Sequence, residues 1–181
     1  MESHRASLIE CLTADEDAFS DRLTDAVETH DIDGVDPGAE PSVPEDLPES
    51  VLGDLTPFER RMVARMDCFD TAPLGLTLTG PAYQDNPVRY ATTTFRELTG
   101  YSLSDLRGEN LRLLQGPDTE GEAVADLYEA IDIWEQMTVE LWNYRKDGTR
   151  FRNRVTVVPL HGPDGTITNW LGVQEDVTGE G

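Results

Sequence analysis

Three primary amides, Asn143, Asn153 and Gln174, occur in segments that alternate between apolar and polar residues. Side chains in a strand point to opposite faces in turn, so each amide shares a face with apolar or small neighbours. A buried amide without a hydrogen-bond partner costs roughly 1–3 kcal/mol. Two alternatives follow: a planar polar ligand whose edge carries donors and acceptors, or amides that pair with one another and with loop backbone. Residue spacing alone leaves both open.

Strands are expected to position these amides. Period-two alternation and intervening turn residues predict strands at 74–79, 88–91, 138–144, 150–160 and 166–177. The last three follow one another with glycine-containing turns between them, which predicts a three-strand meander. The chain therefore gives two strands, a central stretch of other structure, and then three more strands.

Helices are expected before and between the strands. Thr56-Pro57-Phe58-Glu59 has the composition of a capping box and predicts a helix at 57–68. Short helical turns are expected near Phe95, after Ser102 and at 111–114. A further capping box at Thr119–Glu122 predicts a helix that runs to about residue 132.

A motif lies between the short helical turns. Gly108-Glu-Asn-Leu-Arg-Leu-Leu-Gln-Gly116 resembles the flavin-binding motif of light-oxygen-voltage (LOV) domains, a subfamily of PAS domains. That motif reads Gly-x-Asn-Cys-Arg-Phe-Leu-Gln-Gly, and six of its nine positions match. Further matches follow the order of the LOV pattern: Asp85-Asn86-Pro87, Phe95–Tyr101, Trp142-Asn143-Tyr144, Phe151-Arg152-Asn153 and Gly172-Val173-Gln174. The resemblance covers roughly residues 72–177, the length of a LOV core.

The resemblance implies an α+β PAS/LOV fold: a five-stranded antiparallel sheet with short helices on one face, preceded by an N-terminal helical extension. It also implies a flavin bound without a covalent bond. Asn110 and Gln115 would contact the ribityl chain and the ring region. Arg112 would pair with the flavin phosphate, a charge-assisted contact that suits guanidinium geometry.

The three amides fall at ligand positions of the LOV pattern. Asn143 and Asn153 would bond to the pyrimidine edge of the isoalloxazine ring, and Gln174 would face its N5 and O4 atoms. The residues expected to line the rest of the pocket are Thr77, Thr79, Asn86, Leu114, Val124, Ile131, Leu141, Val155, Val157 and Gly172.

Two positions depart from the LOV pattern. Leu111 stands where the family has its reactive cysteine, and a leucine cannot form the thiol adduct with the flavin. Cys11 and Cys68 lie outside the motif. Tyr128 stands where many LOV domains have a second phosphate-binding arginine, so Arg112 alone should hold a phosphate more weakly. FMN is the expected cofactor, with riboflavin and FAD as alternatives.

Without the cysteine, a signal would have to follow photoreduction. A photoexcited flavin could take an electron from a nearby aromatic residue and become a semiquinone; the candidate donors are Trp170, Tyr101, Tyr128 and Tyr90. Protonation at N5 would then allow the Gln174 amide, which can donate or accept, to rotate. The resemblance thus implies a cysteine-less LOV photoreceptor for blue light or redox state, similar to LOV domains of haloarchaeal bacterio-opsin-activator-like proteins.

Partners are expected on the outer face of the sheet, which is apolar at Trp142, Tyr144, Val158, Leu171 and Val173. This face either packs under the 57–68 helix or forms a homodimer or partner surface together with the N-terminal helix. No output domain follows the core before Gly181, so the output is expected from the N-terminal extension, from a change of oligomeric state or from a separate signalling partner. Alternative functions are a PAS interaction module without flavin or without photochemistry, and a flavin redox protein.

Three regions are predicted along the chain. Residues 1–54 form an acidic N-terminal extension, with a helix at about 15–30 that begins in a capping box at Thr13–Glu16, and then a proline-rich linker. Residues 55–71 form an N-terminal cap helix. Residues 72–178 form the PAS/LOV flavin-binding core.

Composition excludes several classes. The formal net charge of -22, with 36 acidic and 14 basic residues, argues against nucleic acid and anionic membranes as partners. The acidity fits a halophilic, archaeal source, because high salt screens the repulsion between like charges. Two distant cysteines fit a reducing cytoplasm. Three scattered histidines show no metal-ligand spacing, and no catalytic motif is present, so no enzyme is expected.

Overall fold

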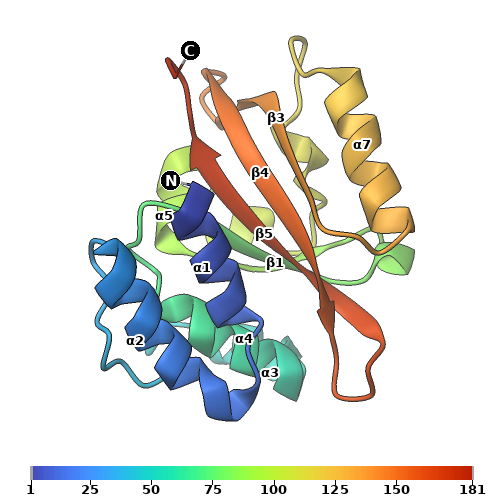
Figure 1. Cartoon of the computed structure of the whole chain (residues 1–181). Coiled ribbons are helices and arrows are strands. Elements are labelled where there is room, and N and C mark those ends of the chain that lie inside the picture. The colour runs from blue at the N-terminus through green and yellow to red at the C-terminus, as the bar shows by residue number, and fades with distance from the viewer. Residues whose placement is uncertain (1, 181) are drawn as a thin grey trace. The chain divides into compact units, whose positions relative to one another are not determined.

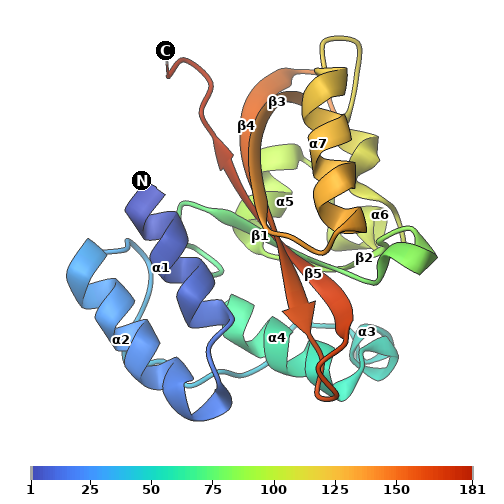
Figure 2. The same cartoon turned by 45° about the vertical axis from the view of Figure 1, so that its right-hand side comes forward.

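The computed structural model describes residues 2–180, and the chain divides into two compact units on either side of the Pro73–Leu74 bond. Figures 1 and 2 show the chain from two directions. The first unit is helical, with α1 (Glu2–Leu12), η1 (Glu16–Ala18), α2 (Phe19–His30), α3 (Glu49–Asp54) and α4 (Pro57–Asp67). From Asp31 to Pro48 the chain forms turns and no helix or strand.

The helices of the first unit are joined by polar contacts as well as by apolar packing. His4 at the start of α1 lies 4.9 Å from His30 at the end of α2, measured between ring centroids, so the two helices run antiparallel. The Arg65 guanidinium of α4 donates to the backbone oxygens of Leu12 and Ala14, at 3.1 and 2.6 Å. It also lies over the Phe19 ring. These bonds satisfy carbonyls that the end of α1 leaves without a helical partner.

Three sequence expectations for this unit are tested by the structure. The capping box of α4 is confirmed, since the Thr56 hydroxyl accepts from the Glu59 amide and the Glu59 carboxylate accepts from the Thr56 amide. The capping box at Thr13–Glu16 is wrong: the Thr13 hydroxyl donates to the Ile9 carbonyl, and the α-helix starts only at Phe19. Helix α1 was not predicted, because Arg5 lies among its buried residues and interrupts the apolar face that includes Leu8, Ile9 and Leu12.

The second unit contains a five-stranded antiparallel sheet with the order β2-β1-β5-β4-β3. Its strands are β1 (Gly75–Thr79), β2 (Val88–Ala91), β3 (Met137–Tyr144), β4 (Arg150–His161) and β5 (Ile167–Asp176). Between β2 and β3 the chain forms α5 (Thr93–Thr99), α6 (Leu103–Leu106), η3 (Leu111–Leu114) and α7 (Gly121–Asp132), and η2 (Ala82–Gln84) precedes β2. The predicted fold class, α+β with five antiparallel strands and short helices, is confirmed.

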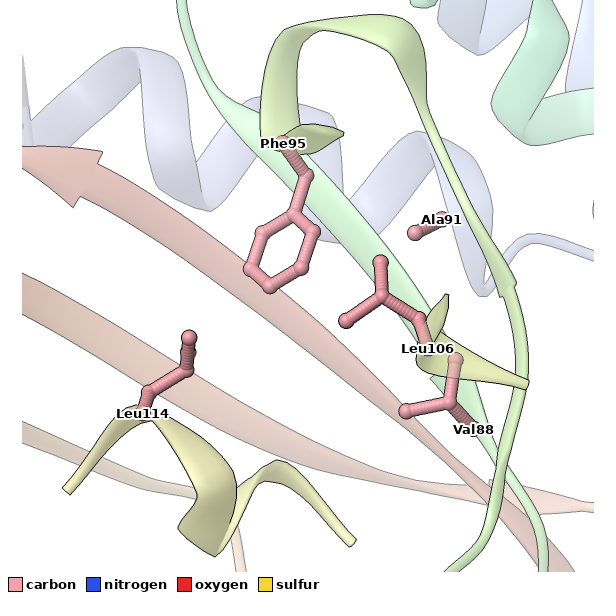
Figure 3. Close-up of a cluster of buried hydrophobic side chains, with 5 residues drawn as sticks. All are labelled: Val88, Ala91, Phe95, Leu106 and Leu114. Atoms are coloured by element: carbon pink, nitrogen blue, oxygen red, sulfur yellow. The ribbon is translucent and has the colours of Figure 1, made fainter. Parts of the chain in front are cut away.

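The short helices after β2 enclose a small apolar core. Val88, Ala91, Phe95, Leu106 and Leu114 are all buried and come from β2, α5, α6 and η3 (Figure 3). Figure 3 shows Phe95 and Leu106 directed into the space between β2 and η3. This cluster fixes the η3 segment relative to the sheet, and η3 carries the LOV-like sequence motif.

The segment before α7 covers part of the outer edge of β3. The Thr119 hydroxyl donates to the Trp142 carbonyl at 2.6 Å, and the Trp142 amide donates to the Glu120 carboxylate at 2.9 Å. The predicted capping box at Thr119–Glu122 is therefore wrong, because Thr119 is bonded to the sheet and no side chain caps α7. Tyr144 is also engaged: its ring lies against Gly116, and its hydroxyl accepts from the Asp118 amide at 2.9 Å.

Candidate functional site

A cavity of about 830 Å³, including its open mouth, lies in the second unit between the sheet, η3 and α7. The cavity is lined by residues of β1, β3, β4 and β5 on one side and of η3 and α7 on the other. On α7 the apolar residues Val124, Leu127 and Ile131 are only half-buried, because they border the cavity instead of a packed core.

The structure brings together every residue that the sequence predicted for the site. The lining includes Thr77, Thr79, Asn86, Asn110, Leu111, Arg112, Leu114, Gln115, Val124, Tyr128, Ile131, Leu141, Asn143, Asn153, Val155, Val157, Gly172 and Gln174. Three lining residues were not predicted: Leu127, Trp170 and Leu171. Leu127 lies on the apolar face of α7, and Trp170 shares the strand face of Gly172 and Gln174, so periodicity could have indicated both. Leu171 was expected on the outer face of the sheet, because strand alternation places it opposite Gly172, yet it is among the residues that line the cavity.

The amides of Asn143 and Asn153 are bonded to each other on adjacent strands. The Asn153 side-chain amide donates to the Asn143 side-chain oxygen at 2.9 Å, and the Asn143 amide donates to the Leu114 carbonyl at 3.3 Å. Both side chains are buried, with 2% and 5% exposed for Asn153 and Asn143. The Asn153 side-chain oxygen is buried and finds no hydrogen-bond partner among the described residues. It is an acceptor that a ligand with an N–H group would satisfy.

Gln174 on β5 presents a second buried acceptor of this kind. Its amide nitrogen donates to the Thr77 hydroxyl on β1 at 3.2 Å. Its side-chain oxygen is buried and, within residues 2–180, has no partner. Gly172 provides the space for both side chains: a Cβ there would lie 2.8 Å from the Gln174 amide nitrogen and closer still to the Thr77 hydroxyl. The glycine is therefore required by the close approach of these groups.

A polar cluster lies at the η3 side of the cavity. Arg112 forms a bidentate ion pair with Asp85, with nitrogen–oxygen distances of 2.7 and 2.5 Å, and its Nε donates to the Tyr128 hydroxyl at 3.3 Å. Asn110 caps η3 by accepting from the Arg112 amide at 2.8 Å. The bond from Arg112 holds the pKa of the Asp85 carboxyl below its usual value, and Asp85 holds the pKa of Arg112 above its usual value. Both groups therefore stay charged at neutral pH.

Comparisons with known proteins place the chain in a family. Residues 77–179 match the model of a PAS domain. A solved light-oxygen-voltage domain, from work on the mechanism of such domains with a flavin analogue, is 40% identical with a TM-score of 0.59; the match covers 62% of this chain and 83% of that one. The chain therefore belongs to the PAS domain family and, within it, to the LOV domains.

Two relatives with longer chains are similar to this protein over about two thirds of its length. The Halobacterium salinarum bacterioopsin transcriptional activator is 38% identical over 70% of this chain and 19% of its own length. A Listeria monocytogenes blue-light photoreceptor is 37% identical over 64% of this chain and 45% of its own length. The chain thus spans less than half the length of these relatives. The haloarchaeal relative agrees with the halophilic character expected from the acidic composition and with the archaeal source that the resemblance implied.

Neither cysteine takes part in the cavity. Cys11 and Cys68 are free and belong to the first unit, and neither is among the lining residues. Burial raises the pKa of Cys11 to about 12 and that of Cys68 to about 11, so both thiols stay protonated at neutral pH.

Across residues 2–180, no group of three or more His, Cys, Asp and Glu side chains is arranged to hold a metal, and no helix is long and apolar enough to cross a membrane.

Proposed function

We propose that this chain is the sensory part of a blue-light or redox photoreceptor that binds a flavin without a covalent bond and signals without a cysteinyl adduct. The observation that carries the proposal is the pair of buried, unpartnered acceptors on Asn153 and Gln174, two residues that line one cavity together with Leu111. LOV domains bind flavin, and blue-light photoreceptors occur among the relatives. FMN is the cofactor proposed first, with riboflavin and FAD as alternatives.

The residues fit the polar edge of an isoalloxazine ring. That edge carries one N–H group between two carbonyls, so it needs an acceptor flanked by donors. The Asn153 side-chain oxygen supplies the acceptor, and the amide nitrogens of Asn143 and Asn153 are donors close to it. The apolar faces of Leu141, Val155 and α7 would contact the two sides of the ring and exclude water from it.

Gln174 would carry the signal in this proposal. A bound flavin would supply light-driven one-electron chemistry together with proton uptake at its N5 atom, which the Gln174 side chain would face. In the structure Gln174 is one of the residues that line the cavity; its side-chain oxygen is buried without a partner, and its nitrogen donates to Thr77. The Thr77 hydroxyl can accept from the amide nitrogen or donate to the amide oxygen, so it can satisfy Gln174 in either orientation. A rotation of this amide would change the contacts of β5.

The direct test is reconstitution and illumination of the purified chain. We expect a yellow protein after refolding with FMN or riboflavin. With a thiol reductant as the source of electrons, blue light should convert it to a radical species that gives an electron paramagnetic resonance signal. A protein that stays colourless with both flavins would rule out the photoreceptor. A yellow protein that is not photoreduced would favour the alternative, a PAS module that binds flavin without using it as a sensor.

Trp170 is proposed as the electron donor to the excited flavin. Of the four candidate aromatic residues, only Trp170 and Tyr128 line the cavity. Trp170 is 3% exposed, whereas Tyr128 is 42% exposed and bonded to Arg112. We expect Trp170→Phe to slow photoreduction severalfold at equal flavin occupancy. In the unchanged protein the thiol reductant would return an electron to the oxidised indole of Trp170. Tyr101→Phe is the matched control, and equal rates in both variants would exclude Trp170 as the donor.

The output of the sensor is proposed to lie outside residues 1–181. The relatives are two to five times longer than the segment they share with this chain, and some related proteins are histidine kinases. We propose no enzymatic activity for this segment itself and a cytoplasmic location based on its unpaired cysteines. We also propose a signalling partner or a second copy at Trp142 and Tyr144 of the outer sheet face, because Val158, Leu171 and Val173 of that face are already buried within the chain. The domain division at residues 54, 71 and 178 likewise remains a proposal.

A further inference from the structure

Trp134 combines a strained backbone with an exposed side chain. It follows the end of α7 by two residues, and its φ of 57° lies in the left-handed region, which is an outlier for a bulky side chain. Because 65% of Trp134 is exposed, burial of the indole does not offset this strain. Backbone strain of this kind is concentrated at functional sites, so a tryptophan at this position calls for an explanation other than packing.

The backbone of Trp134 is bonded to the helix that forms one wall of the cavity. The Trp134 amide donates to the Ile131 carbonyl at 3.3 Å, and the Glu135 amide donates to the Ala130 carbonyl at 2.9 Å. These are the two bonds of a Schellman motif, in which residue 134 takes the left-handed position that glycine usually fills. Since Ile131 lines the cavity, Trp134 lies within one helical turn of the cavity wall and is open to water.

Trp170, the proposed electron donor, is out of reach of a dissolved reductant. It lines the cavity and is 3% exposed, so a thiol in solution cannot contact its indole when a flavin fills the cavity. Once Trp170 has given up an electron, a replacement has to arrive through another side chain. An exposed aromatic residue near Trp170 would meet this need.

Trp134 lies at the same end of the sheet as Trp170. On β5, Trp170 pairs with Pro159 of β4; two residues before Pro159, Val157 pairs with Met137, the first residue of β3. Trp134 precedes Met137 by three residues. Neighbouring strands are about 4.8 Å apart, so two strands separate the segments by about 10 Å. Electrons can tunnel between aromatic rings over such a separation.

The charges around the indoles favour Trp134 as the site that loses an electron to Trp170. Asp132 and Glu135 flank Trp134 in the sequence and are exposed, and their negative charges stabilise an indole radical cation. At Trp142 the opposite holds, because the Arg150 guanidinium lies 4.2 Å from the centroid of its ring. Trp142 is also absent from the cavity wall.

We propose that Trp134 is an electron-relay residue that passes electrons from an external thiol to Trp170. The inference rests on the proposed flavin-binding function, with Trp170 as the donor. Trp170 loses one electron to the light-excited flavin, Trp134 gives one electron to the Trp170 radical cation, and a thiol returns one electron to Trp134. The thiol releases one proton, which balances the proton taken up at flavin N5, and two of the resulting thiyl radicals combine to a disulfide.

The test measures the rate of photoreduction by a thiol, at equal flavin occupancy, in Trp134→Phe, Trp170→Phe and the double variant. Trp134→Phe should be severalfold slower than the unchanged protein, because the electron returns to Trp170 from the flavin before the thiol can act. The double variant should be no slower than Trp170→Phe, since the relay acts through Trp170. A further slowing in the double variant would show that Trp134 acts without Trp170 and would overturn the relay.

Tyr83→Phe is the matched control. Tyr83 is 86% exposed, and it follows Thr79, the β1 partner of Trp170, by four residues. It is therefore an exposed aromatic residue at the same end of the sheet, but a phenol is harder to oxidise than an indole. Its rate should equal that of the unchanged protein; a Tyr83→Phe protein that is slow beside a normal Trp134→Phe protein would contradict the proposal.

Trp134→Gly separates the relay from any structural role of the side chain. Glycine adopts a positive φ without strain, so urea denaturation of the flavin-free variant should show a free energy of unfolding at least as high as that of the unchanged chain. Its photoreduction should nevertheless be as slow as that of Trp134→Phe. A variant that is less stable and slow would point to a structural role for Trp134 and overturn the relay.

The oxidised residue can also be located directly. After illumination in air without thiol, with azide present to remove singlet oxygen, peptide mass spectrometry should find oxidation products at Trp134 that are lost in Trp170→Phe. Equal oxidation of Trp134 in that variant would exclude the electron transfer. If the unchanged protein is itself not photoreduced, the proposed function fails as well, whereas normal photoreduction in Trp134→Phe overturns this inference alone.

Discussion

Leu111→Cys is expected to give the flavin-loaded protein a reversible adduct photocycle that the unchanged chain cannot have. Leu111 lines the cavity from η3 and is packed against the Phe95 cluster, so its position is fixed by buried neighbours. A thiol there would add its sulfur to the flavin and give its proton to N5, with no electron donor needed. Illumination should bleach the flavin band without a radical signal, and the band should return in the dark.

Leu111→Ala separates the thiol chemistry from the loss of side-chain volume. It opens the same wall of the cavity but offers no sulfur, so it should show photoreduction like the unchanged protein. Both variants lose apolar contacts and should be somewhat less stable. A flavin-loaded Leu111→Cys protein that still gives only the radical would mean that the side chain of residue 111 does not approach the reactive carbon of the ring.

The double substitution Asn143→Leu/Asn153→Leu should abolish flavin binding while destabilising the empty fold less than Asn143→Leu alone, although both remove the donor to the Leu114 carbonyl. The two amides are bonded to each other, and replacing both partners of a buried hydrogen bond by apolar groups can be close to neutral. The ligand, however, would lose its donors and acceptor at the polar edge. We expect the dissociation constant to rise by at least about 100-fold, since each unsatisfied buried group costs roughly 1–3 kcal/mol.

The single variant Asn143→Leu tests how much the bond between the two amides contributes to the stability of the empty fold. It leaves the Asn153 amide without its acceptor, so urea denaturation should show a lower free energy of unfolding, by about 1–3 kcal/mol, than for the double variant. If the double variant were as destabilised as the single one while flavin affinity stayed high, the amides would be structural residues and not ligand contacts.

Much of the site could be predicted from sequence because its residues carry two independent signals. Asn143, Asn153 and Gln174 interrupt apolar strand faces, and they also fall at defined positions of the LOV pattern. The structure places all of them on one cavity wall. Strand boundaries were also accurate, because period-two alternation ends sharply at glycine-containing turns, as at Gly148 and Gly165.

What the sequence could not provide were the hydrogen-bond partners that individual side chains take in the folded chain. Two capping boxes had the right composition, but the hydroxyl of Thr13 bonds to its own preceding turn and that of Thr119 bonds to a strand edge. Both alternatives depend on the geometry of the folded chain. The same is true of Asp85, which precedes Arg112 by 27 residues, so its occupation of the guanidinium fork is visible only in three dimensions.

The two unpartnered acceptors also couple the abundance of the protein to the supply of its cofactor. In the unfolded chain water bonds to the oxygens of Asn153 and Gln174, so the empty folded state carries their desolvation cost, roughly 1–3 kcal/mol each. A ligand at 100 times its dissociation constant would add about 2.7 kcal/mol of stability, a large share of the 5–15 kcal/mol typical of a folded domain. Cellular proteolysis removes the unfolded fraction, so molecules without flavin would be degraded first.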